Sequence, residues 1–297
     1  MKRFLALMML LFMIMFGAMS ANAQHYNAGT EVTDTATIGS GFTLRSYNTF
    51  YTADKFMNDD GDNIAPSNFE TNQFTSFLRA YYMTDLGFLG AKYGFGLGLP
   101  VGYTDLKIGT FSDDNFNIGD VLLEPVILQW NYDKFGAFAS VGVFAPTGDF
   151  EANDPVSIGG GHWTIMPSVG GIFYIDDAKT WSLGATARYE FNTEVEDTDF
   201  RHGDVFTTEY GVTKAFPICD DKFSVGVQGY TRYQTTDSDI NDVDIKDSRE
   251  FVTAVGPAIG YHFDALNLDI GAKAFFELAA ENQTEGAKYM LNVSYKF

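Results

Sequence analysis

Apolar and polar residues alternate along most of this chain, and the last nine residues show the pattern most clearly. From Tyr289 to Phe297, every second residue is apolar or aromatic, and the residues between them are mostly polar. Strict alternation over this length is typical of a β-strand whose two faces meet different surroundings. An edge strand of a soluble sheet would also fit this stretch alone, so the rest of the chain has to decide.

The same alternation recurs in twelve segments after position 38. The gaps that follow the even-numbered segments are short, and those that follow the odd-numbered segments are mostly longer and acidic. Short periplasmic turns that alternate with longer outer loops are typical of outer-membrane barrels. We therefore predict an all-β fold, a single transmembrane antiparallel β-barrel of about 12 strands. The segments are 38–51, 71–84, 92–107, 116–131, 134–148, 162–176, 180–193, 204–216, 222–236, 249–263, 266–280 and 287–297.

The start of the chain reads as an export signal. Two basic residues precede an apolar run over 4–17 that is too short to span a membrane, and Ala21-Asn22-Ala23 has the small-x-small pattern of a cleavage site. Export and a barrel together predict a location in the bacterial outer membrane. The predicted parts are a signal peptide (1–23), a polar arm that is either disordered or a small lumen plug (24–37), and the barrel (38–297).

Composition narrows the class further. The net charge of −20 argues against nucleic acid as a partner, and the single cysteine, Cys219, excludes an internal disulfide framework. Aromatic residues make up 16% of the chain, which fits the aromatic girdles that a barrel places at both membrane interfaces. Membrane lipid is therefore the expected surrounding.

Parity along each strand predicts which face meets lipid. In the segment 180–193, Trp181 and Leu183 share one face, whereas Arg188 and Glu190 share the other. A charge that faces lipid near the midplane costs roughly 2–4 kcal/mol for Arg or Lys, so the polar faces should point inward. Prolines remove ladder donors, so we expect bulges at the three that interrupt strands. These are Pro125, Pro167 and Pro257.

The inward faces supply ten candidate substrate-binding residues. In the fourth segment, the parity that places Glu124 inside also places an apolar wall inside, opposite small residues of the third and tenth segments. Such a wall suits a binding pocket better than a wide wet pore. The charged candidates form either a network that stiffens the barrel or a path for solute. The candidates are Leu122, Val126, Leu128, Trp130, Arg188, Glu190, Glu209, Tyr230, Arg232 and His262.

Catalytic and metal-binding patterns are weak. The four histidines lie outside any G-x-S-x-G or H-E-x-x-H arrangement, so we predict no enzyme activity, no catalytic residue and no cofactor. The acidic stretch 237–244 places oxygen atoms at alternate positions, as a Ca²⁺ loop does. It lacks the Gly and the closing Glu of an EF-hand, so we predict a solvated loop and no metal site.

Two resemblances add to this interpretation. The terminal strand resembles the closing strand of bacterial outer-membrane barrels, whose aromatic last residue serves as an assembly signal. That resemblance implies the outer-membrane assembly machinery as a partner, through Phe297.

An ordered series of motifs over roughly 40–297 resembles the outer-membrane transporters of the phenol meta-cleavage pathway, relatives of the long-chain fatty-acid transporter barrels. The chain departs from this family at Phe200, His202 and Gln283, where Tyr, Ser and Arg are usual. The motifs are Gly119-Asp120, Ala145-Pro146-Thr147-Gly148-Asp149-Phe150, Gly159-Gly160-Gly161-His162-Trp163, Asp199-Phe200-Arg201-His202-Gly203-Asp204, Gly226-Val227-Gln228-Gly229-Tyr230 with Gln234, Gly256-Pro257, and Glu281-Asn282-Gln283-Thr284-Glu285-Gly286.

The family resemblance implies passive uptake of small hydrophobic or aromatic compounds, here through a narrow lumen, with a small hydrophobic solute as partner. Two alternatives stay open: a general water-filled porin, and a structural or adhesive outer-membrane barrel. Strand number does not decide between them, because twelve strands fall between barrels filled by side chains and barrels with an aqueous channel.

Overall fold

A single antiparallel sheet closes on itself through its first and last strands. β1 (Gly41–Phe56) pairs with β16 (Thr284–Lys296) along its length, from Thr43 opposite Lys296 to Phe56 opposite Thr284. The amide of Phe297 also donates to the carbonyl oxygen of Phe42 at 3.0 Å. Closure leaves no open sheet edge, which a barrel in lipid requires.

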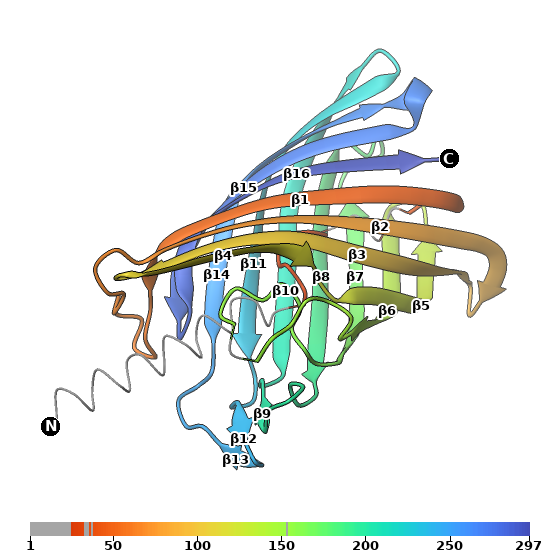
Figure 1. The fold of residues 1–297 in the computed structure, drawn as a ribbon. Helices are drawn as coiled ribbons and strands as arrows, with labels where there is room; N and C mark the ends of the chain where they lie inside the picture. The colour runs from red at the N-terminus through yellow and green to blue at the C-terminus, as the bar shows by residue number, and fades with distance from the viewer. Residues whose placement is uncertain (1–24, 33–35, 37, 153) are drawn as a thin grey trace, which may run out of the picture.

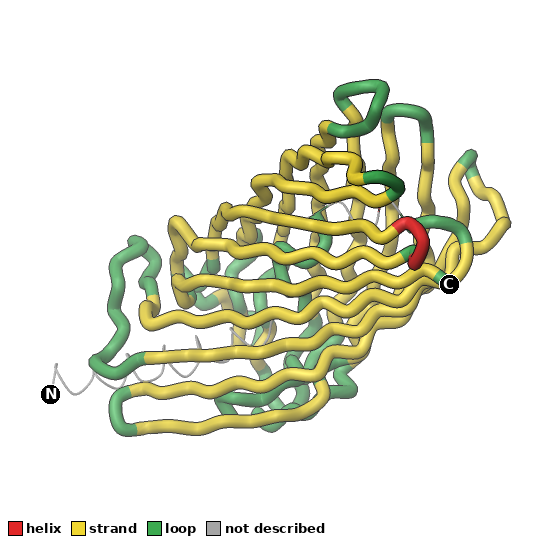
Figure 2. Tube along the Cα trace, turned by 90° about the horizontal axis from the view of Figure 1, so that it is seen from above, coloured by secondary structure: helices red, strands yellow, loops and turns green. Residues whose placement is uncertain are grey.

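The computed structural model describes residues 25–32, 36, 38–152 and 154–297, and its strands run side by side around one lumen (Figures 1 and 2). The sheet has thirteen labelled strands, but β4 and β5 are successive halves of one strand, because both pair with β3. The wall of the barrel thus has twelve strands, which confirms the predicted fold. The remaining wall strands are β2 (Glu70–Phe88), β3 (Ala91–Ile108), β4 (Phe111–Ile118), β5 (Val121–Asn131), β6 (Phe135–Ala145), β7 (Thr164–Tyr174), β8 (Trp181–Asn192), β10 (Val205–Ile218), β11 (Asp221–Gln234), β14 (Phe251–Phe263) and β15 (Leu268–Glu281).

The two ends of the barrel differ. Short turns join the strands at the end that holds the C-terminus, where the 3-10 helix η2 (Asp264–Leu266) lies. Longer loops lie at the other end and carry a small sheet of β9 (Phe200–Arg201), β12 (Asp239–Ile240) and β13 (Val243–Asp244), at the bottom of Figure 1. This asymmetry matches the predicted periplasmic and outer ends.

The distribution of side chains is inside out compared with a soluble protein. Leu97, Val227 and Leu291 are about half exposed on the outer face, whereas Arg79 and Glu209 are buried inside. Apolar residues outward and polar residues inward are the arrangement that a barrel in lipid needs. Among the described residues, no helix is long and apolar enough to cross a membrane.

The prolines behave differently from one another. The register of β5 against β6 shifts between Leu123 and Val126, so the expected bulge at Pro125 is present. At Pro167 and Pro257 the ladders keep their register, and the expectation of bulges there is wrong. At each of those two prolines, the strand instead lacks a few backbone pairs with one of its two neighbouring strands.

Residues 25–32, in the described part of the chain before β1, lie inside the barrel. Residues 26 and 28–32 are buried, and their partners come from strands around the whole ring. Of the two alternatives for the arm, the described part is therefore a plug in the lumen. The predicted signal peptide (1–23) lies outside the described residues.

Candidate functional site

A cavity of about 160 Å³ lies in the outer half of the lumen, above the plug. Its floor is residues 25–28, and its wall comes from strands on both sides of the ring together with the β6–β7 loop. Besides the floor, the lining residues are Thr49, Tyr51, Gln73, Thr75, Pro100, Gly102, Thr104, Gly119, Asp120, Ile158, Tyr230, Arg232, Val252, Glu277, Gln283, Thr284 and Lys288.

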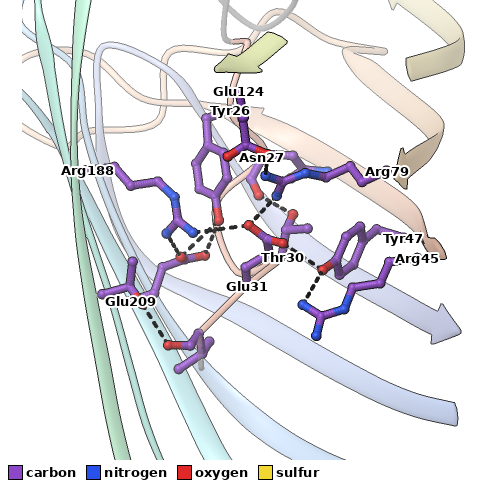
Figure 3. Close-up of polar contacts among 12 residues, drawn as sticks. Tyr26, Asn27, Thr30, Glu31, Arg45, Tyr47, Arg79, Glu124, Arg188 and Glu209 are labelled. Carbon is purple, nitrogen blue, oxygen red and sulfur yellow. Dashed lines mark hydrogen bonds and ion pairs between the residues drawn. The ribbon is translucent and has the colours of Figure 1, made fainter. Parts of the chain in front are cut away.

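Glu31 anchors the plug to the barrel wall through the polar contacts that Figure 3 shows. Its carboxylate forms ion pairs with Arg79 and with Arg188, the latter at 3.2 Å. The hydroxyls of Tyr47 and Tyr81 each donate to Oε1 of Glu31 at 2.7 Å. The buried carboxylate thus has two charge partners and two hydroxyl donors from three strands, as a charge out of water requires.

A second anchor holds the turn of the plug. The hydroxyl of Tyr26 donates to the carboxylate of Glu209 at 2.9 Å, and the amide of Gly29 donates to the same group at 2.7 Å. Arg188 pairs with Glu209 and also lies over the ring of Tyr26, 4.3 Å from its centroid. Gly29 has φ of +90°, and a Cβ there would meet the Phe275 ring at 2.7 Å, so glycine is needed at this turn.

Lysines satisfy carbonyl groups of the plug. Nζ of Lys288 donates to the carbonyl oxygen of Ala28 at 2.8 Å, and Nζ of Lys273 donates to those of Gly29 and Thr30 at 3.2 and 3.1 Å. A backbone carbonyl buried without a donor destabilises a fold, so these contacts let the segment stay inside the barrel.

The end of the plug reaches the outer loops through His25. Its ring bonds to Asp120 at 2.7 Å through Nε2 and to Thr164 at 2.7 Å through Nδ1. Asp120 also accepts hydrogen bonds from the amides of Gly148 and Gly160, at 2.8 and 2.6 Å. The break between β4 and β5 at Asp120 therefore joins the plug and the β6–β7 loop.

Two buried histidines of the outer loops lie beside His25. The ring centroids of His25 and His162 are 4.5 Å apart, and those of His162 and His202 are 5.4 Å apart. Burial, reinforced by His25, lowers the pKa of His162 to about 4, and burial with His162 lowers the pKa of His202 well below its ordinary value. In the part of the chain that is described, no cluster of three or more His, Cys, Asp or Glu residues could hold a metal ion.

Glu277 closes one side of the cavity. It accepts hydrogen bonds from Tyr51 and Tyr230, both at 2.9 Å, and from the amide of Gly286 at 2.6 Å. The ladder between β15 and β16 ends at Phe276, so the carboxylate takes the place of the next backbone pair. Glu277 also lines a more open hollow of about 630 Å³ between the outer ends of β1, β2, β15 and β16.

The cavity also contains donors that lack acceptors. Arg232 bonds to Glu250 through Nη1 at 3.2 Å, but within the described residues its buried Nε has no hydrogen-bond partner. The same is true of Nε2 of Gln283. The ammonium of Lys288 lies 4.6 Å from the centroid of the Tyr230 ring, besides its bond to the plug.

The predicted site residues lie in different parts of the barrel. Tyr230 and Arg232 line the cavity, and Arg188 and Glu209 lie below it and hold the plug. Glu190 is buried inside, and Leu122 packs inside in one cluster with Tyr26, Phe144 and Met166. His262 is part of a different region, at the periplasmic end, where it bonds to Asp269 at 2.8 Å.

Three residues of the predicted apolar wall face outward. Val126 is 37% exposed, and Leu128 and Trp130 share its face, whereas Ile127 and Gln129 are buried inside. The prediction that Val126, Leu128 and Trp130 line the lumen is wrong, because the bulge at Pro125 adds one residue and inverts the parity of everything after it.

Sequence reasoning missed the plug residues. Tyr26 and Glu31 were covered only by the prediction of a polar arm, although an aromatic and a carboxylate in that stretch can match inward arginines. Lys288 was missed too. It is a charge in the alternating stretch before the C-terminus, at the parity that turns out to face the lumen. That charge was the signal that could have identified it.

The comparisons agree with this architecture. An outer membrane channel from Pseudomonas putida F1 superposes with a TM-score of 0.76 at 16% identity, covering 92% of this chain and all of that one. The β domain of the Bordetella autotransporter BrkA gives 0.57 at 9% identity, covering 87% and 100%. A mutant of the TodX monoaromatic hydrocarbon channel gives 0.50 at 11% identity, covering 92% and 95%. At these identities the likeness concerns the fold.

No curated protein sequence matches the chain significantly. The fold and the lipid-facing surface make the chain a β-barrel of the bacterial outer membrane, as predicted. A family model described as "Putative MetA-pathway of phenol degradation" matches residues 53–293, most of the barrel. The chain therefore belongs to that family of outer-membrane barrels, which confirms the resemblance found in its motifs.

Proposed function

We propose that this barrel mediates passive uptake of small hydrophobic or aromatic compounds across the outer membrane, through the cavity above the plug. The proposal assigns the chain a transport role and no chemistry of its own. Family membership supports this solute class, and so does the barrel fold that the chain shares with a monoaromatic hydrocarbon channel.

One observation carries the proposal against a water-filled porin. Residues 25–32 lie in the lumen and are held there by the Glu31 and Glu209 anchors, and residues 25–28 form the floor of a cavity of about 160 Å³. An engineered cavity of about 150 Å³ takes one benzene molecule, so this one accommodates a single ring. A pocket of that size suits one small solute at a time.

The test is a pair of measurements on the full-length protein. In planar bilayers we expect low and intermittent ion conductance, because the plug fills the lumen. In liposomes that contain the protein, we expect a small aromatic solute to enter faster than in protein-free liposomes. A large steady conductance that grows in proportion to salt would favour the porin, and equal uptake with and without the protein would contradict transport.

We also propose how the chain reaches the membrane. Residues 1–23 are removed on export, and the terminal Phe297 is read by the outer-membrane assembly machinery. Phe297 is 68% exposed, which supports its accessibility to a partner. Deletion of Phe297 should lower the amount of heat-modifiable barrel in the outer membrane. An unchanged yield would refute the assembly role.

A further inference from the structure

We propose that the cavity above the plug binds a small organic anion, a single ring that bears one carboxylate or phenolate group. This inference rests on the proposed uptake function and narrows its solute class. It is drawn from the donors and acceptors of the residues that line the cavity.

The acidic residues of the cavity wall are already satisfied. Asp120 accepts from His25 and from backbone amides of the β6–β7 loop. Glu277 accepts from two tyrosine hydroxyls and from the amide of Gly286. Neither carboxylate therefore needs a donor from a ligand, and both are held in place by protein groups.

Some of the basic and amide groups that line the cavity lack hydrogen-bond acceptors. Among the described residues, Nε of Arg232 and Nε2 of Gln283 are buried without a hydrogen-bond partner. Lys288 has three donor hydrogens, and it donates one of them to the carbonyl oxygen of Ala28. Buried polar groups are rarely left unpaired, so the two unpaired donors, with the ammonium of Lys288 in the same lining, point to a missing acceptor. A carboxylate or phenolate oxygen supplies it, with charge that matches Arg232 and Lys288.

The opposite side of the cavity offers apolar contacts beside the polar Thr104 and Asp120. Pro100, on β3, and Ile158, on the β6–β7 loop, line it there. β3 and β11, which carries Arg232, have five strands between them in either direction around the ring, so they face each other across the lumen. A ring against Ile158 and an acidic group toward Arg232 would satisfy both sides. The acidic outer loops do not attract an anion, so the preference for an anionic solute comes from Arg232 and Lys288.

The experiment measures equilibrium binding of benzoate and of its neutral isostere benzamide to the full-length protein in detergent. We expect benzoate to bind about tenfold more tightly or better. Lys288→Met and Arg232→Gln should each reduce benzoate affinity to near that of benzamide, and leave benzamide binding almost unchanged. Lys55→Gln, at an exposed ion pair with Glu285, is the matched control.

Because Arg232→Gln leaves Glu250 without its partner, the double variant Arg232→Gln/Glu250→Gln tests the same point with the pair neutralised. Equal affinity for benzoate and benzamide, or full benzoate affinity in a folded Lys288→Met variant, would overturn the inference. Liposome uptake separates the two proposals. If benzamide enters through the protein but benzoate has no advantage, the anion site is refuted and transport stands. If neither enters faster than in protein-free liposomes, transport itself fails.

Discussion

Glu31 and Arg188 meet 3.2 Å apart in the centre of the barrel although 157 positions separate them in the chain. One belongs to the plug and the other to β8, so this contact ties the polar arm of the sequence to the wall. Figure 3 shows this contact, and the cavity has residues 25–28 of the same plug as its floor.

Replacing Glu31 should loosen the plug. In Glu31→Ala, the guanidinium groups of Arg79 and Arg188 lose one of their buried partners, which should destabilise the barrel by roughly 3 kcal/mol. We expect a lower thermal transition and a higher basal conductance in planar bilayers. Glu285→Ala, which removes the partner of the exposed Lys55, should change stability by about 1 kcal/mol or less. Unchanged conductance in Glu31→Ala would mean that the plug stays in place without this anchor.

The bulge at Pro125 can be tested by spin labelling in a Cys219→Ser background. Labels at Val126 and Leu128 should be reached by oxygen from the lipid, and labels at Ile127 and Gln129 should be shielded, because parity inverts after the bulge. Relaxation by oxygen and by a water-soluble nickel reagent provides the measurement. A label at Val126 or Leu128 that responds mainly to nickel would restore the lumen-facing assignment.

The outer loops should become less stable at acidic pH. The ordinary pKa of a histidine is about 6.5, and burial lowers that of His162 to about 4. Between these values the unfolded chain binds a proton that the folded loop excludes, so stability is intact above the upper value and falls as pH drops toward the lower one. We expect a lower thermal transition at pH values in this window, and a smaller decrease in His162→Asn. The same decrease in both proteins would assign the effect to other groups.

Orientation can be tested with the single native thiol. Cys219 is exposed in the turn between β10 and β11, at the end that holds the C-terminus. A membrane-impermeant maleimide applied to intact cells should leave it unlabelled and should label Asp242→Cys in a Cys219→Ser background, because Asp242 lies in an exposed outer loop. Labelling of Cys219 without permeabilisation would reverse the orientation.

The strands and their number could be predicted because alternation is a local property. Each strand has one face toward lipid and the other toward the lumen. The apolar Trp181 therefore marks the lipid face of its strand, and the charged Arg188 marks the lumen face. The inward positions of Arg188, Glu209 and Arg232 followed for the same reason. The carboxylate that each arginine meets could not be predicted in the same way. Arg232 bonds to Glu250 and Arg188 to Glu209, and which inward charges meet depends on the height of each strand.

By itself, the sequence determined the class of fold, the inward and outward faces of most strands, and the family. Only the tertiary structure decided the rest. A single added residue at Pro125 inverted the parity of Val126, Leu128 and Trp130, because a period of two does not persist across a bulge. The plug is the clearer case, since a short polar segment has no periodic signal. Its position comes from contacts of Tyr26 and Glu31 with strands that are distant in the chain and adjacent only once the barrel has closed.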